Sequence, residues 1–98
     1  MDWNHLHAFL QTAERGSLSA AARHMGVTQP TLSRQVAALE VELGVTLFER
    51  VGRSVLVTKA GAGLLEYART MGTAAHDLAL AVDFAYKRSQ HFGPILSH

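Results

Sequence analysis

The sequence contains no cysteine and no large excess of either charge. The missing cysteine excludes a disulfide framework, a thiolate nucleophile and a zinc site built on cysteine. Nine Lys and Arg stand against eight Asp and Glu, so the net charge of +1 does not by itself indicate nucleic acid. No apolar run approaches the ~18 residues of a membrane span, and residues 1–7 do not resemble a signal peptide. These absences predict a soluble, cytoplasmic protein without membrane association.

The composition instead indicates one folded domain with an extension. Of the 98 residues, 48 % are hydrophobic and 17 % are charged, which is too apolar and too balanced for a disordered tail. Gly16, Gly26 and Gly44 each follow a segment with apolar residues at helical spacing. Because glycine tolerates the left-handed conformation that ends a helix, these positions predict three helices in the first half of the chain. The first helix is expected to bury Trp3, Leu6, Phe9, Leu10 and Ala13.

The second and third helices form the strongest local signal, a helix–turn–helix unit over residues 17–43. Ser17 can cap the second helix, and residues 25–28 form a tight turn. Thr28 can cap the third helix over residues 29–43, and Pro30 is tolerated there because the first-turn amides have no partner within the helix. The inward stripe of this third helix comprises Leu32, Val36, Leu39 and Leu43.

After Gly44 the apolar period becomes shorter. Residues 47–50 and 55–58 are rich in strand formers, and residues 51–54 between them form a turn, so a small β-hairpin is expected.

From Thr58 a long helix is expected to run to about Ser89, with apolar residues alternately three and four apart. One such stripe cannot be buried on the preceding head, so we expect a homodimer through helix 59–89. Residues 90–98 contain Gly93 and Pro94 and are expected to form a frayed tail. The expected dimerisation residues are Leu64, Ala68, Met71, Ala75, Leu78, Val82 and Ala85.

The helix–turn–helix unit points to double-stranded DNA as partner. In such readers the second helix enters the major groove by its N-terminal end, where free amides attract phosphate. Glutamine suits adenine edges, arginine suits guanine or phosphate, and the threonine methyl can meet a thymine methyl. The alternative is that these polar residues only cap the helix and face solvent. The expected DNA-binding residues of the third helix are Thr28, Gln29, Pro30, Thr31, Ser33, Arg34, Gln35 and Ala38.

The hairpin adds Arg50 and Arg53, which can reach phosphates or the minor groove. The alternative is that Arg50 pairs with an acidic residue and Arg53 faces solvent. Residues 23–59 carry a surplus of two positive charges, which predicts few phosphate contacts per subunit and a need for dimerisation.

Enzymatic and metal chemistry have no support in the sequence. His5 and His7 are two residues apart on a helix and point to different sides, so no metal site is expected. The sequence has no phosphate-cradling glycine loop and no nucleophile elbow, so neither an enzyme nor a cofactor is expected.

Several runs of the sequence resemble LysR-type transcriptional regulators. They include residues 9–22 with Gly16-Ser17-Leu18-Ser19-Ala20-Ala21-Ala22, residues 27–36, Leu47-Phe48-Glu49-Arg50 and Thr58-Lys59-Ala60-Gly61. The resemblance covers about residues 2–88 and implies a mainly α fold, a winged helix-turn-helix with a small β-hairpin wing followed by a dimerisation helix. The implied domains are 1–58 for DNA binding, 59–89 as linker helix and 90–98 as tail.

By this resemblance, the recognition-helix positions are Gln29, Pro30, Thr31, Ser33 and Arg34, and Arg53 matches a wing arginine used at the minor groove. Family members bind interrupted inverted repeats near promoters as dimers or tetramers. They normally continue into a ligand-binding domain, which residues 90–98 do not resemble, so no small-molecule effector site is expected within this chain.

Three hypotheses follow from these observations. The first is sequence-specific DNA binding by a homodimer that regulates transcription. The second is an interaction module whose long helix binds partner subunits while the head contacts protein. The third, an enzyme, lacks any pair of residues with the spacing for acid–base or nucleophilic work.

Overall fold

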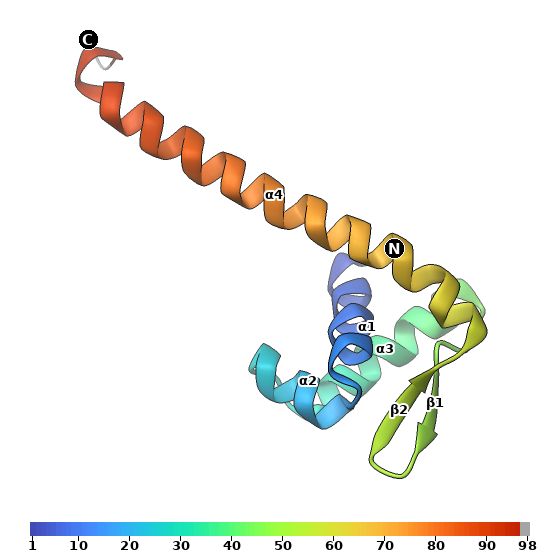
Figure 1. Cartoon of the computed structure of the whole chain (residues 1–98). Helices are drawn as coiled ribbons and strands as arrows, with labels where there is room; N and C mark the ends of the chain where they lie inside the picture. The colour runs from blue at the N-terminus through green and yellow to red at the C-terminus, as the bar shows by residue number, and fades with distance from the viewer. Residues whose placement is uncertain (97–98) are drawn as a thin grey trace.

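A head of three helices and a hairpin carries one long helix that projects away from it (Figure 1). The computed structural model describes the backbone of residues 1–96 and the side chains of residues 1–88. The molecule measures 60 × 25 × 19 Å because the last helix extends far beyond the head. This arrangement confirms the mainly α, winged helix-turn-helix fold. The elements are α1 (Trp3–Arg15), α2 (Leu18–Met25), α3 (Gln29–Leu43), β1 (Phe48–Val51), β2 (Ser54–Val57) and α4 (Lys59–Leu96).

Local side-chain hydrogen bonds fix where the helices begin. The Ser17 hydroxyl accepts a hydrogen bond from the amide of Ala20 at 3.0 Å, and the Thr28 hydroxyl accepts one from Thr31 at 3.4 Å. Both caps satisfy amides that have no partner within their helix. The helices end at glycines, as at Gly26, whose φ of 70° lies in the left-handed region. The predicted boundaries of α2 and α3 are thus confirmed.

The core of the head consists of two apolar clusters that share α1 and α3. One joins α1, α2 and α3 around Leu32 and Ala21, and the other joins α1, α3 and α4 around Phe9 and Leu39. Of the residues expected inside α1, Leu6, Phe9 and Leu10 are buried. The prediction that Trp3 is buried is wrong. Trp3 lies in the first turn of α1, where its exposed ring stacks on the ring of His7 with centroids 5.9 Å apart.

The wing is the two-stranded antiparallel hairpin β1–β2, which pairs Phe48 with Val57 and Val51 with Ser54. It joins the head through its apolar face and its backbone. Val55 is buried in the first cluster, and its amide donates a hydrogen bond to the carbonyl of Gly16 at 3.1 Å. The hairpin is therefore fixed beside the turn between α1 and α2 rather than free in solvent.

Helix α4 begins directly after the wing and crosses the head closely. The Thr58 hydroxyl accepts a hydrogen bond from the amide of Gly61 at 3.0 Å, which confirms Thr58 as the cap. A Cβ atom at Gly61 would lie 2.5 Å from the carbonyl oxygen of Leu47, and one at Gly72 would lie 2.9 Å from Leu10. The close approach of α4 to the head therefore requires glycine at position 61, where a methyl group would meet backbone, whereas at position 72 the end of the Leu10 side chain would only have to shift.

The C-terminal end of α4 differs from the expectation. The helical backbone continues to Leu96, although a frayed tail was expected over residues 90–98. Extension of an existing helix does not repeat the cost of nucleating a first turn, although Pro94 has no N–H and adds no backbone hydrogen bond of its own. Residues 97–98 lie outside the described residues.

Candidate nucleic-acid interface

The first two turns of α3 expose a row of polar side chains. Gln29, Pro30 and Arg34 are exposed, and Thr31 and Ser33 are half-buried beside them. The Thr28 and Thr31 hydroxyls lie 2.8 Å apart, and an Arg34 guanidinium nitrogen donates a hydrogen bond to the Thr31 hydroxyl at 3.4 Å. This chain of contacts orients Arg34 along the helix surface while it leaves most of its donors free.

Two other predicted residues of α3 are less accessible. Gln35 and Ala38 are half-buried, and the side-chain oxygen of Gln35 is buried without a hydrogen-bond partner. Gln35 thus lies on the flank of α3 that turns toward the head, and its role in DNA binding stays a prediction.

The two wing arginines occupy different positions. Arg50 on β1 donates a hydrogen bond to the Ser33 hydroxyl of α3 at 2.8 Å. The contact is with a hydroxyl and not with the acidic residue that the alternative interpretation required. Arg53 is exposed in the turn of the hairpin, next to Gly52 with its φ of 61°. The wing thus has one arginine held against α3 and one at its tip.

Between the wing and the N-terminal ends of α2 and α3 lies a polar notch, here called the wing notch, with a volume of about 410 Å³. It brings together Gln29 of α3 with Arg50 and Arg53 of the wing. Ser19 and Ser54 also line it, and neither was predicted from the sequence. Among residues 1–88, whose side chains the structure describes, no acidic side chain lines the notch. A group that binds there meets two guanidinium groups and short hydroxyl donors.

An acidic residue that sequence reasoning missed holds the wing in place. The Glu40 carboxylate on α3 accepts hydrogen bonds from the backbone amides of Leu47 at 2.6 Å and Phe48 at 3.4 Å. Together with the contact between Arg50 and Ser33, this fixes the first strand of the wing to α3 at two points. No local pattern distinguishes Glu40 from a solvated helical acid, because its partners are contributed by the loop after α3.

Comparison with known proteins decides the family. Residues 3–62 match the family model described as a bacterial regulatory helix-turn-helix protein of the lysR family. The chain belongs to the LysR family. It is 49 % identical over 71 residues to the transcriptional regulator TfdS of Cupriavidus pinatubonensis, covering 72 % of this chain and 24 % of that protein. It is 46 % identical over 71 residues to ClcR of Pseudomonas putida, with the same coverage. The chain thus spans about a quarter of the length of these relatives.

Solved structures of the family show the same fold. The chain is 38 % identical to the CbnR DNA-binding domain in complex with DNA, with a TM-score of 0.76 over 88 % of this chain and 99 % of that one. It is 34 % identical to the BenM DNA-binding domain in complex with catB site 1 DNA, with a TM-score of 0.78 over 85 % of this chain and 92 % of that one. This chain therefore carries a LysR-type DNA-binding domain, and its named relatives are transcriptional regulators.

The predicted dimerisation residues of this LysR-type chain divide into two groups. Ala68 is only 1 % exposed, and Leu64 is half-buried, because both pack against the head of their own chain. The prediction that Ala68 contacts a partner is therefore wrong. Past the head, Leu78 and Val82 are 65 % and 60 % exposed. The members of the stripe that remain exposed are Met71, Ala75, Leu78, Val82 and Ala85.

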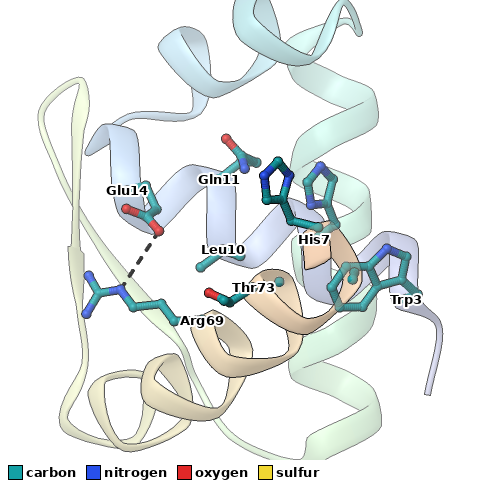
Figure 2. Close-up of a pocket in the computed structure, with 10 residues that line it drawn as sticks. Trp3, His7, Leu10, Gln11, Glu14, Arg69 and Thr73 are labelled. Carbon is teal, nitrogen blue, oxygen red and sulfur yellow. Dashed lines mark ion pairs between the residues drawn. The ribbon is translucent and has the colours of Figure 1, made fainter. Parts of the chain in front are cut away.

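A second groove lies between α1 and α4 of the LysR-type domain and has a volume of about 680 Å³. Figure 2 shows its mixed lining, with Glu14 paired to Arg69 at 3.8 Å and Trp3 beside His7. Within the described residues, no group of three or more histidine or acidic side chains could hold a metal ion. The same part of the chain contains no helix with the length and apolar character to span a bilayer.

Proposed function

We propose that this LysR-type domain binds double-stranded DNA sequence-specifically as a homodimer and regulates transcription at a promoter that carries an interrupted inverted repeat. In this proposal residues 1–58 bind the DNA, with α3 in the major groove, and α4 joins the two copies. The observation that carries the proposal is the exposed row of Gln29, Pro30 and Arg34 directly beside a wing with two arginines.

The DNA contact proposed for each side chain follows from its position on α3 or on the wing. Gln29 and Arg34 present free donors at the exposed end of α3, and such groups read adenine and guanine edges in the major groove. Arg53 at the tip of the wing is placed for the adjacent minor groove, whose negative potential attracts arginine. The wing notch between them faces the phosphate backbone that separates the two grooves, and its cationic lining suits that charge.

The exposed stripe of α4 supports the homodimer. Leu78 and Val82 are large apolar side chains at heptad spacing, and both are mostly exposed. A two-fold dimer carries two equivalent recognition helices, so its natural target is a pair of inverted half-sites. Because long helices separate the two heads, the half-sites would be separated by base pairs that no recognition helix touches.

Binding titrations with promoter and scrambled duplexes test the DNA proposal. Arg34→Ala and Gln29→Ala should each weaken specific binding by about 1–3 kcal/mol and leave binding to the scrambled duplex nearly unchanged. Lys87→Ala is the matched control, because it removes one positive charge from α4 at a site far from the wing. If both α3 variants bind the two duplexes with wild-type affinity, the assignment of α3 as reader is wrong.

Sedimentation at micromolar concentration tests the homodimer. Leu78→Asp places a charge in the centre of the exposed stripe, so the dimer should dissociate and its affinity for DNA should fall. A wild-type chain that stays monomeric with and without DNA contradicts the proposed homodimer. A chain that dimerises but shows no salt-dependent affinity for DNA supports an interaction module instead.

A further inference from the structure

Strand β1 lies along one flank of α3, and hydrogen bonds hold it there at two levels. Toward the C-terminal end of α3, the Glu40 carboxylate accepts hydrogen bonds from the amides of Leu47 and Phe48. Toward the N-terminal end, an Arg50 guanidinium nitrogen donates a hydrogen bond to the Ser33 hydroxyl at 2.8 Å. Ser33 and Glu40 are seven residues apart, which is about two turns, so both leave α3 on the same side.

Arg50 bonds a hydroxyl although an acid lines the same small pocket. The pocket has a volume of about 70 Å³ and is lined by Ser33, Glu40 and Arg50 among others. Glu40 is engaged by backbone amides of the loop after α3. Among residues 1–88, whose side chains the structure describes, no carboxylate forms an ion pair with Arg50. Arg50 is exposed, so water solvates its charge, and its contact with Ser33 is not a substitute for an ion pair.

Ser33 occupies a position from which α3 can read a base. It follows Gln29 by four residues, so the two side chains are neighbours on one face of the helix. Ser33 is half-buried between that face and the wing, where Arg50 contacts it. If α3 enters the major groove, the Ser33 hydroxyl can therefore contact Arg50 on one side and a base edge on the other.

The contact with Arg50 leaves the hydroxyl proton of Ser33 for another partner. A serine hydroxyl has one hydrogen to donate and two lone pairs that accept. A guanidinium group only donates, so Arg50 occupies a lone pair and cannot take the proton. Thr70 shows the usual alternative, because its hydroxyl donates to the carbonyl of Glu66 four residues earlier. Ser33 makes no such bond within the described residues, so its proton is available to a group outside the chain.

The charge of Arg50 determines which groups suit the Ser33 hydroxyl. A hydroxyl that accepts a hydrogen bond from a charged donor is polarised, which makes it a stronger donor and a weaker acceptor. In the major groove, guanine, adenine and thymine present acceptors, whereas cytosine presents only the hydrogens of its amino group. Beside Arg50, a cytosine amino group would thus meet a donor and a positive charge. A serine without Arg50 makes no such distinction, because a free hydroxyl turns to donate or to accept.

We propose that Arg50 is a positioning residue that acts through Ser33: it holds the Ser33 hydroxyl as a donor, so that α3 rejects cytosine at the base that Ser33 contacts. This inference rests on the proposed function, in which α3 enters the major groove, and it adds a specificity determinant that the wing contributes. A guanidinium group has five N–H donors. Those that Ser33 does not use remain for the phosphate backbone, so affinity and base preference have separate origins within one side chain.

Binding titrations on a set of promoter duplexes test this role. Each base pair of a half-site is changed in turn to the other three, and the dissociation constant is measured for the wild type, Ser33→Ala and Arg50→Ala. In the wild type, cytosine at the position that Ser33 contacts should weaken binding about tenfold relative to the best base, as one mismatched base pair typically does. Both variants should reduce this cytosine ratio to about threefold or less, because neither retains a hydroxyl that is held as a donor.

Arg53→Ala is the matched control, because it removes the same charge from the wing at an exposed residue in its turn. It should weaken binding to all of these duplexes by a similar factor and leave the cytosine ratio within about twofold of the wild type. The double variant Ser33→Ala with Arg50→Ala should show the same cytosine ratio as Ser33→Ala alone. Arg50 acts on this ratio only through Ser33, so its removal has no further effect once the hydroxyl is gone.

The outcomes separate this inference from the proposed function. If Arg34→Ala relaxes base discrimination but Arg50→Ala weakens binding uniformly, as Arg53→Ala does, α3 reads DNA and the role of Arg50 through Ser33 is wrong. The same conclusion follows if Ser33→Ala and Arg50→Ala relax discrimination at different positions. A wild type that accepts cytosine at every position affected by Ser33→Ala overturns the assignment of Ser33 as a donor. A chain that binds promoter and scrambled duplexes equally overturns the inference together with the proposed function.

Discussion

The head and the outer part of α4 use apolar residues in opposite ways. In the head, Phe9, Leu32 and Leu39 are fully buried by other elements of the same chain. In α4 beyond residue 72, large apolar side chains such as Leu78 and Phe84 are mostly exposed. The contrast shows that the head buries its large apolar side chains within itself. The outer part of α4 carries apolar side chains that its own chain does not bury. Stability should therefore reside in the head, and association in α4.

The largest expected change in the free energy of unfolding comes from a comparison of two phenylalanines, one in each region. Phe9→Ala should lower the free energy of unfolding by about 3–5 kcal/mol, because it removes a buried ring and leaves a cavity between α1, α3 and α4. Phe84→Ala should change it by less than about 0.5 kcal/mol, because the ring is exposed. Urea denaturation measures both values. Similar losses for the two variants would contradict the contrast between the regions.

Within α4, two glycines sharpen the boundary between the part that contacts the head and the part that does not. Gly61→Ala should cost about 1–3 kcal/mol, because the new methyl would meet the backbone of Leu47 and α4 would have to move. Gly63→Ala has open space around it and should stabilise the helix by about 0.5–1 kcal/mol. Thermal unfolding of the two variants gives opposite shifts in Tm if α4 crosses the head as described. Two shifts of the same sign would argue against this crossing.

A comparable effect is expected where the wing joins α3. Glu40→Ala should destabilise the chain by about 1–3 kcal/mol, because the Leu47 amide loses its acceptor. Glu49→Ala is the control, since Glu49 is an exposed acid on β1. Its free energy of unfolding should stay within about 0.5 kcal/mol of the wild type. Equal losses in urea denaturation would show that Glu40 does not hold the wing.

The smallest effect concerns a cap inside the helix–turn–helix unit. Ser17→Ala removes the acceptor for the Ala20 amide and should cost about 1 kcal/mol. Ser17→Asp retains a capping oxygen and should restore most of that loss. Chemical denaturation of the two variants provides the comparison. An Asp variant as unstable as the Ala variant would mean that Ser17 contributes through packing rather than through the cap.

Features that depend on neighbours in the sequence were predictable, and features that depend on distant partners were not. The caps Ser17, Thr28 and Thr58 each bond an amide three residues later, so their roles follow from local spacing. Likewise, the polar row at the start of α3 follows from helical periodicity alone. The position of Arg50 against Ser33 depends on how the hairpin folds back onto α3, seventeen residues away, and local spacing gives no signal for it.

The heptad of α4 illustrates the same limit. Its period correctly marks one apolar face, but the period does not say what covers that face. Ala68 is covered by α1 and α3 of its own chain, whereas Leu78 projects beyond the head. Only the length of α4 in relation to the size of the head distinguishes the two positions. How far α4 extends beyond the head depends on the tertiary structure. The sequence pattern alone therefore predicted both residues to lie in one interface.

Guanine-methylation interference on promoter DNA shows whether α3 reads the major groove, because N7 methyl groups block that groove. We expect two clusters of interfering guanines in inverted half-sites on the same face of the duplex. With Arg34→Ala, interference should weaken at the guanines that contact Arg34. A pattern that Arg34→Ala leaves unchanged, or binding that no major-groove methyl group impairs, would contradict the claim that α3 reads DNA.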